Sequence, residues 1–201
     1  MTKSKIIVFA GLMLFLTLSC STDILTPTSD YETDQALNTL TRQPAGYTWT
    51  LKFSDDFNGS SIDSSKWDPT WWGWYTFPNC GDAYFSPGQL EVSNGTLKIK
   101  ADKKTTYAYG NTYRYVSGQM FTTNKFTQTY GYFEARIKLP TGKGMHPGFW
   151  LGPNDGVWPP EIDIMEAIND TNTVYQSYHW RDEAGRHLQQ VNAERGDFRG
   201  W

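Results

Sequence analysis

Alternation between apolar and polar residues is the strongest pattern along this chain. It is clearest over residues 132–139, where every second residue is apolar and Pro140 follows directly. The apolar positions are Phe133, Ala135, Ile137 and Leu139. Side chains two apart lie on the same face of a strand, so this segment predicts a β-strand with one apolar face.

Residues 89–101 show the same alternation, interrupted once by Asn94-Gly95. Leu90 and Val92 stand before this dipeptide, and Leu97, Ile99 and Ala101 stand after it. An Asn-Gly pair between two alternating runs is typical of a two-residue hairpin turn. The segment therefore predicts a β-hairpin.

Further strands are predicted over 47–53, 113–121, 161–168 and 173–180. No segment has the period of a helix of useful length, and residues 185–201 show no strand pattern. Many short strands separated by turns predict an all-β sandwich or barrel. One face of its strands is apolar, and the polar and aromatic groups of the other face can line a groove.

The N-terminus has the pattern of a secretory signal. Lys3 and Lys5 precede residues 6–18, an apolar stretch that is short for a membrane span but suits a signal peptide. Residues 17–20, Thr-Leu-Ser-Cys, resemble a bacterial lipobox, which predicts lipid attachment to Cys20. The alternative is an ordinary signal peptide with an incidental cysteine.

These features divide the chain into a lipoprotein signal peptide over 1–20, a flexible tether over 21–46 and one domain over 47–201. The tether is polar and has no clear period. We therefore expect the protein in a bacterial cell envelope, anchored by lipid on the outer surface or in the periplasm.

Composition and charge narrow the class of ligand that the protein is expected to bind. The chain has 9 Trp, 12 Tyr and 11 Phe, most of which we expect in a core, and a net charge of -3 without a long basic run. This balance gives nucleic-acid binding no electrostatic support and suits a neutral ligand, such as a sugar, that stacks on rings. The two cysteines, Cys20 and Cys80, predict neither a disulfide framework nor a cysteine-based metal site.

Residues 161–166, Glu-Ile-Asp-Ile-Met-Glu, place three acids in one predicted strand. Glu161 and Asp163 share a face, and the isoleucines that follow each of them are expected in the core. Glu166 has the wrong parity to join them unless a one-residue bulge lies near Met165.

With that bulge, Glu161 and Glu166 would lie roughly 5 Å apart, the separation expected of a retaining glycosidase. Three adjacent carboxylates cannot all ionise cheaply, so one proton is retained and its holder becomes the natural acid. A solvated acidic edge strand and a calcium site are the alternatives. Strands seldom carry so many acids, and the segment lacks the Gly and Asn spacing of a calcium loop.

The acidic segment resembles the bulged E-x-D-x-x-E signature of glycoside hydrolase family 16. The similarity includes 130–140 and 144–151 and covers roughly 51–180. It implies a jelly roll of two curved antiparallel sheets with the substrate in a concave groove. It also implies Glu161 as nucleophile, Asp163 as its electrostatic partner and Glu166 as general acid/base.

The resemblance further implies sugar-binding positions. Trp150 and Trp158 stand where family members line the groove near the cleaved bond, and Phe149 is then expected in the core. His179 and Ser177 share one face of the strand over 173–180 with Tyr175, next to the acid/base. His146, in a loop before Pro147, is interpreted as structural.

The chain resembles the laminarinases of family 16, but two positions depart from their pattern. Asn79 resembles a sugar-contacting asparagine, but the residues around it differ, and Gln119 stands where many laminarinases carry arginine. Trp71, Trp72, Trp74 and Tyr75 form an aromatic loop that either flanks the groove or packs under the sheet.

The sequence thus predicts an endo-acting retaining hydrolase of a β-linked polysaccharide, with β-1,3- or mixed-linkage glucan first. The alternatives are a non-catalytic surface glycan-binding protein and a transglycosylase. We expect a monomer that needs no cofactor for catalysis, and the family resemblance leaves room for a structural calcium without assigned ligands. Family members continue with more strands, so we expect the 201 residues to be a fragment.

Overall fold

The computed structural model describes residues 12–16, 44, 46–71, 73–75 and 81–198. These residues form an all-β fold, as the sequence predicted, and contain no α-helix. The predictions for Cys20, Asn79, Cys80 and Trp72 lie outside this part of the chain. None of the described helical turns is long and apolar enough to cross a membrane.

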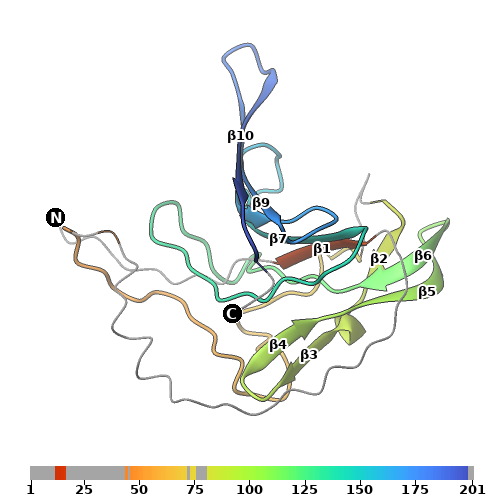
Figure 1. The fold of residues 1–201 in the computed structure, drawn as a ribbon. Helices are drawn as coiled ribbons and strands as arrows, with labels where there is room; N and C mark the ends of the chain where they lie inside the picture. The colour runs from red at the N-terminus through yellow and green to blue at the C-terminus, as the bar shows by residue number, and fades with distance from the viewer. Residues whose placement is uncertain (1–11, 17–43, 45, 72, 76–80, 199–201) are drawn as a thin grey trace.

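The largest sheet has five strands in the order β1-β7-β8-β9-β10, all antiparallel. Its strands are β1 (Leu12–Leu16), β7 (Met145–Leu151), β8 (Glu161–Glu166), β9 (Thr173–Arg181) and β10 (His187–Arg195). β1 lies within the apolar stretch expected in the signal peptide, which stays a prediction. In Figure 1 the β9–β10 hairpin projects from the rest of the molecule.

Two smaller sheets lie beside this one (Figure 1). One contains β2 (Ala83–Phe85), β6 (Asn111–Ser117) and β5 (Ala101–Ala108), and the other contains β3 (Leu90–Ser93) and β4 (Thr96–Ile99). A short 3-10 turn, η2 (Pro87–Gln89), precedes β3. The pairing of β2 with β6 is parallel, unlike the antiparallel arrangement expected throughout.

The β3–β4 hairpin confirms the prediction from the Asn-Gly dipeptide. Ser93 pairs with Thr96, and Asn94 and Gly95 between them have φ angles of 53° and 65°. A turn with two positive φ values matches the twist of the strands that it joins, and asparagine and glycine adopt such values at low cost. The predicted strands over 161–168 and 173–180 are confirmed as β8 and β9.

Three strand predictions were wrong. Residues 47–53 and 132–139 form no strand, and residues 187–195, where none was expected, form β10. Phe133, Ala135 and Ile137 nevertheless pack against the core, so the alternation identified the buried face but not a paired backbone. β10 shows the reverse, because it is exposed along its length and is held by its backbone pairing with β9.

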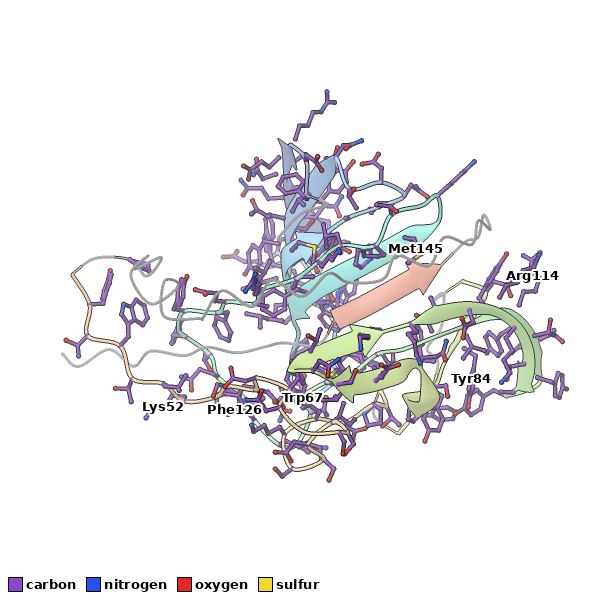
Figure 2. All side chains as sticks on the ribbon, turned by 60° about the horizontal axis from the view of Figure 1, so that its bottom comes forward. Lys52, Trp67, Tyr84, Arg114, Phe126 and Met145 are labelled. Atoms are coloured by element: carbon purple, nitrogen blue, oxygen red, sulfur yellow. The ribbon has the colours of Figure 1, made fainter. Side chains whose placement is uncertain are left out.

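The main core gathers around Trp67. Phe53 packs edge-on against its ring at 5.3 Å, and Phe126 packs on Phe53 at 4.9 Å. The indole N–H of Trp67 donates to Asp55 Oδ2 at 2.8 Å, which satisfies its buried polar atom. Figure 2 shows Trp67 and Phe126 close together, with Tyr84 and Arg114 toward the far end of the β2–β6–β5 sheet.

Candidate active site

A bulge in β8 places its acids on one face. Asp163 pairs with Ser177 of β9 and Glu166 pairs with Tyr175, so β8 uses one more residue than β9 over this stretch. β8 carries the same extra residue against β7. The bulge returns Glu166 to the face of Glu161 and Asp163, as the sequence predicted. We call these three side chains the carboxylate row.

The opposite face of β8 differs from the expectation. Ile164 and Met165, the two residues inside the bulge, both pack against the main core. Ile162 was expected in the core but is 45% exposed. It pairs with Leu151 on one side and with the exposed Tyr178 on the other.

The carboxylate row keeps a proton at its most buried member. Asp163 is only 4% exposed, and its burial, with the charges of Glu166 and Glu161, raises its pKa to about 8. Burial also raises the pKa of Glu161, although a hydrogen bond from the Trp158 side chain opposes that shift. From the sequence the retained proton was expected on the general acid, whereas the structure favours Asp163 because it is covered most completely.

His146 is part of the site, and its interpretation as structural was wrong. Its Nε2 lies 2.7 Å from Glu166 Oε1, with both side chains half-buried. His146 is the second residue of β7, and Gly148 of that strand pairs with Glu166. A contact this short holds one proton between the two groups, so Glu166 has a proton donor or acceptor beside it.

His179 and Ser177 lie on the carboxylate face, but beside Glu161 and Asp163 rather than next to the acid/base Glu166 as the sequence predicted. Ser177 pairs directly with Asp163 across β8 and β9, so both share one face. His179 Nε2 lies 3.3 Å from Asp163 Oδ2 and 3.9 Å from Glu161 Oε1. Trp158 is 41% exposed, and its ring lies 5.7 Å from that of His179.

Phe149 lies in the core, as predicted, whereas Trp150, expected to line the groove, stands on the carboxylate face but is only 8% exposed. Trp150 pairs with Asp163 across β7 and β8. Its ring packs between Trp71 at 5.6 Å and Phe121 at 5.8 Å, and its buried Nε1 has no partner among the described residues. Trp71 of the aromatic loop thus packs against a buried ring of the five-stranded sheet.

Gln119 and His187 are two further polar residues whose positions the sequence did not predict. Gln119 is buried, and its Oε1 also lacks a partner within the described part of the chain. His187, which the sequence analysis did not single out, lies on β10 with its Nε2 3.0 Å from His179 Nδ1. The turn signal at Asp182 and Gly185 would have predicted the β9–β10 hairpin and with it the position of His187.

One set of described side chains has the spacing of metal ligands. Single ligand atoms of Glu161, Asp163 and His179 all lie within 4.8 Å of one another. A set that includes a histidine nitrogen suits a transition metal better than calcium, which prefers oxygen ligands. The same atoms form the carboxylate row, so any such metal would compete with the chemistry of the acids.

Comparison with known proteins agrees with this geometry. A family model described as "Beta-porphyranase A-D, GH16 domain" matches residues 47–198. The chain belongs to glycoside hydrolase family 16.

Among its relatives is the endo-1,3-1,4-beta-glycanase EglC of Rhizobium meliloti, which is 37% identical over 73% of this chain and 36% of its own length. The glucan endo-1,3-beta-glucosidase A1 of Niallia circulans is 38% identical over 69% of this chain and 23% of its own. The family 16 chain therefore spans about a third or less of the length of these curated relatives.

The fold is similar to that of LamAcat from Zobellia galactanivorans. The two chains superpose with a TM-score of 0.66 and 30% identity, over 75% of this chain and 69% of the other. This likeness confirms the jelly-roll class predicted from the resemblance.

Proposed function

We propose that this chain carries the catalytic centre of an endo-acting retaining glycoside hydrolase that cleaves β-1,3- or mixed-linkage glucan. The observation that carries the proposal is the bulged carboxylate row of Glu161, Asp163 and Glu166. The substrate class follows the glucanase names of the relatives described above.

In this mechanism Glu161 attacks the anomeric carbon while Glu166 protonates the departing glycosidic oxygen. The bond to the leaving sugar breaks, and a covalent glycosyl-enzyme forms on Glu161. Glu166, now ionised, takes a proton from water, which displaces Glu161 and restores the original anomeric configuration. His146, 2.7 Å from Glu166, can share the proton that Glu166 gives up in the first step and regains in the second.

Asp163 and Trp158 support the nucleophile. A proton held by Asp163 leaves Glu161 as the ionised member of that neighbouring pair, and a hydrogen bond from Trp158 stabilises the Glu161 carboxylate. The exposed ring of Trp158 supplies a surface on which a pyranose can stack. No step requires a cofactor.

The test is hydrolysis of a glycan panel containing laminarin, lichenan, cellulose, agarose and porphyran. We expect glucan oligosaccharides of several lengths by mass spectrometry, with the β-anomer appearing first by NMR. Glu161→Gln should lower kcat by at least about a thousandfold while glucan binding persists. Glu194→Gln on the exposed β10 is the matched control and should be active.

A second substrate class has one observation in its favour, the match to a family model named for β-porphyranases. Cleavage of porphyran but not of glucan would replace the glucanase assignment. Transfer to added oligosaccharides in place of hydrolysis would indicate a transglycosylase. Glucan binding without cleavage, unchanged by Glu161→Gln, would indicate a non-catalytic binding protein.

We also propose that the protein acts as a monomer held at the bacterial envelope by lipid on Cys20. The three acids of the carboxylate row lie on the single strand β8, so the row needs no residue from a second copy, and the charged and apolar pattern before Cys20 supports the anchor. Metabolic labelling with a fatty acid should mark the expressed protein, and Cys20→Ala should remove the label. Labelling that persists in that variant would exclude this anchor.

A further inference from the structure

All three histidines of the chain gather at the carboxylate row. His146 contacts Glu166, His179 contacts Asp163, and His187 contacts His179. The mechanism above uses only His146 directly. Among the described residues, His187 contacts His179 and Trp158 rather than a carboxylate.

His187 forms the outer end of a series of close polar contacts, one a hydrogen bond and one a charge contact. Its Nε2 lies 3.0 Å from His179 Nδ1, and His179 Nε2 lies 3.3 Å from Asp163 Oδ2. The two imidazole rings are nearly parallel, with centroids 5.2 Å apart and an interplanar angle of 19°. The series therefore runs from a buried carboxyl on β8, through β9, to an exposed residue on β10.

His187 also packs on the tryptophan beside the nucleophile. Its ring lies 4.6 Å from that of Trp158, closer than His179 does. Trp158 in turn makes a side-chain hydrogen bond to Glu161, and its carbonyl accepts from Arg181 at 2.9 Å. His187 thus contacts His179 and Trp158, the two side chains that lie against Asp163 and Glu161.

We propose that His187 is a positioning residue of the active site, which fixes the tautomer of His179 through its hydrogen bond and the orientation of Trp158 through ring stacking. The role rests on the function proposed above. One N–H must lie between the two rings, so His187 determines which nitrogen of His179 carries a proton. That choice decides whether His179 Nε2 donates to Asp163 or accepts from it.

The charged groups around His179 are consistent with an effect of His187 on the protonation of His179. Glu161, Asp163 and Glu166 face it from β8, His187 faces it from β10, and Arg181 follows two residues later on β9. Burial lowers the pKa of His179, the charge of His187 lowers it further, and Glu166 opposes both. Removing His187 should therefore raise the pKa of His179.

Two substitutions separate hydrogen bonding from stacking. His187→Phe keeps a ring against Trp158 but loses the nitrogen, whereas His187→Gln places an amide near the position of Nε2 but loses the ring. We expect kcat of His187→Phe to fall about tenfold with KM changed less than about twofold, because one hydrogen bond is lost without loss of sugar contacts. His187→Gln should keep more of kcat than His187→Phe does.

The pH profile and the ring nitrogens provide readouts that a purely structural role would not move. In His187→Phe the acid limb of kcat/KM should shift to higher pH. With only three histidines in the chain, ¹⁵N signals can be assigned by substitution, and those of His179 should change from one tautomer to a mixture. Gln190→Ala, on the opposite face of β10, is the control for disturbance of the hairpin.

Unchanged kcat, pH profile and His179 signals in His187→Phe would overturn the proposal. A fall in kcat shared equally by Gln190→Ala would overturn it too, because it would reflect the hairpin rather than the histidine. Failure of the function itself looks different, since the wild-type protein would then cleave no glycan of the panel. The ¹⁵N comparison of wild type with His187→Phe tests the tautomer even in that case.

Discussion

At the scale of single residues, the site is governed by how completely each carboxyl is covered. Asp163 is buried between paired residues of β7 and β9, while Glu161 and Glu166 on either side keep partial access to solvent. Three identical chemical groups thereby become different, because burial penalises the charged form of the most covered one. This is why the two reacting carboxyls flank a third that holds a proton.

The raised pKa of Asp163 predicts a pH-dependent stability. In the unfolded chain Asp163 ionises near its ordinary value of 3.8, but in the folded chain only near 8. The folded state therefore loses stability as pH rises from about 4 to about 8, and Asp163→Asn removes this loss. Measured by calorimetry, the Tm of Asp163→Asn minus the Tm of wild type should increase by on the order of 5 °C from pH 5 to pH 9.

A Tm difference that stays constant over this pH range would show that Asp163 ionises alike in both states.

The contact between His146 and Glu166 predicts a second effect of a single residue. Its removal leaves Glu166 without the partner at 2.7 Å, which should impair proton transfer to the leaving group. We expect His146→Phe to lower kcat/KM by about tenfold to a hundredfold. His146→Gln, which can place a polar atom near Nε2, should lose less when both are assayed on the same glucan. Equal losses would mean that ring volume, not the hydrogen bond, matters.

At the scale of the strand, the bulge in β8 decides which way Glu166 points. Residues Ile164 and Met165 both enter the core, and the next side chain emerges on the carboxylate face. A regular strand of this sequence would turn Glu166 inward, where an unpaired carboxyl is costly. The bulge therefore makes the acidic segment compatible with both a packed core and a common acidic face.

The bulge predicts opposite effects of deletion and insertion. Deleting Ile164 restores regular alternation and keeps all three acids on one face, so this variant should fold and retain measurable hydrolysis. Inserting one alanine after Met165 also allows regular alternation, but it places the glutamate about 7 Å farther along the strand from Asp163 than the deletion does, so hydrolysis should be abolished, at least about a thousandfold in kcat. Activity assays with circular dichroism check both variants, and an active insertion variant would contradict this account of the strand.

At the scale of the whole molecule, the five-stranded sheet has one catalytic face and one face that is incompletely covered near β9 and β10. On the latter, Ile162 and Tyr178 pair with each other and are each 45% exposed, and Leu188 is 38% exposed. Trp180, which pairs with Leu188, stacks on Tyr178 at 5.1 Å. Ile162, Tyr178 and Leu188 are the exposed members of an apolar surface to which the half-buried Trp180 also belongs.

This surface predicts binding of hydrophobic dyes and poor solubility. Leu188→Lys places a charge at its outer strand and should reduce ANS fluorescence by roughly a third or more, as well as the aggregate fraction in size-exclusion chromatography. Val191→Lys, on the other face of β10, is a matched control with the same charge change. Equal effects of the two substitutions would attribute the improvement to net charge rather than to this surface.

The sequence anticipated much of this architecture but not all of it. The hairpin at Asn94-Gly95, strands β8 and β9 and the bulge before Glu166 were predicted, because turn chemistry and residue parity are local properties. Residues 132–139 alternate equally well yet form no strand, and the polar segment of β10 forms one. Strand formation depends on a partner backbone, which local periodicity does not specify.

By itself, the sequence determined the all-β class, the order of acids in β8 and the family to which the chain belongs, because each is written in consecutive residues. Only the tertiary structure decided that His146, His179 and His187, carried by three different strands, meet at that row of acids. It also decided that Asp163, rather than its neighbours, is the most deeply covered acid. Contacts and burial arise between segments far apart in the chain, so their effect on protonation exists only after those segments pack together.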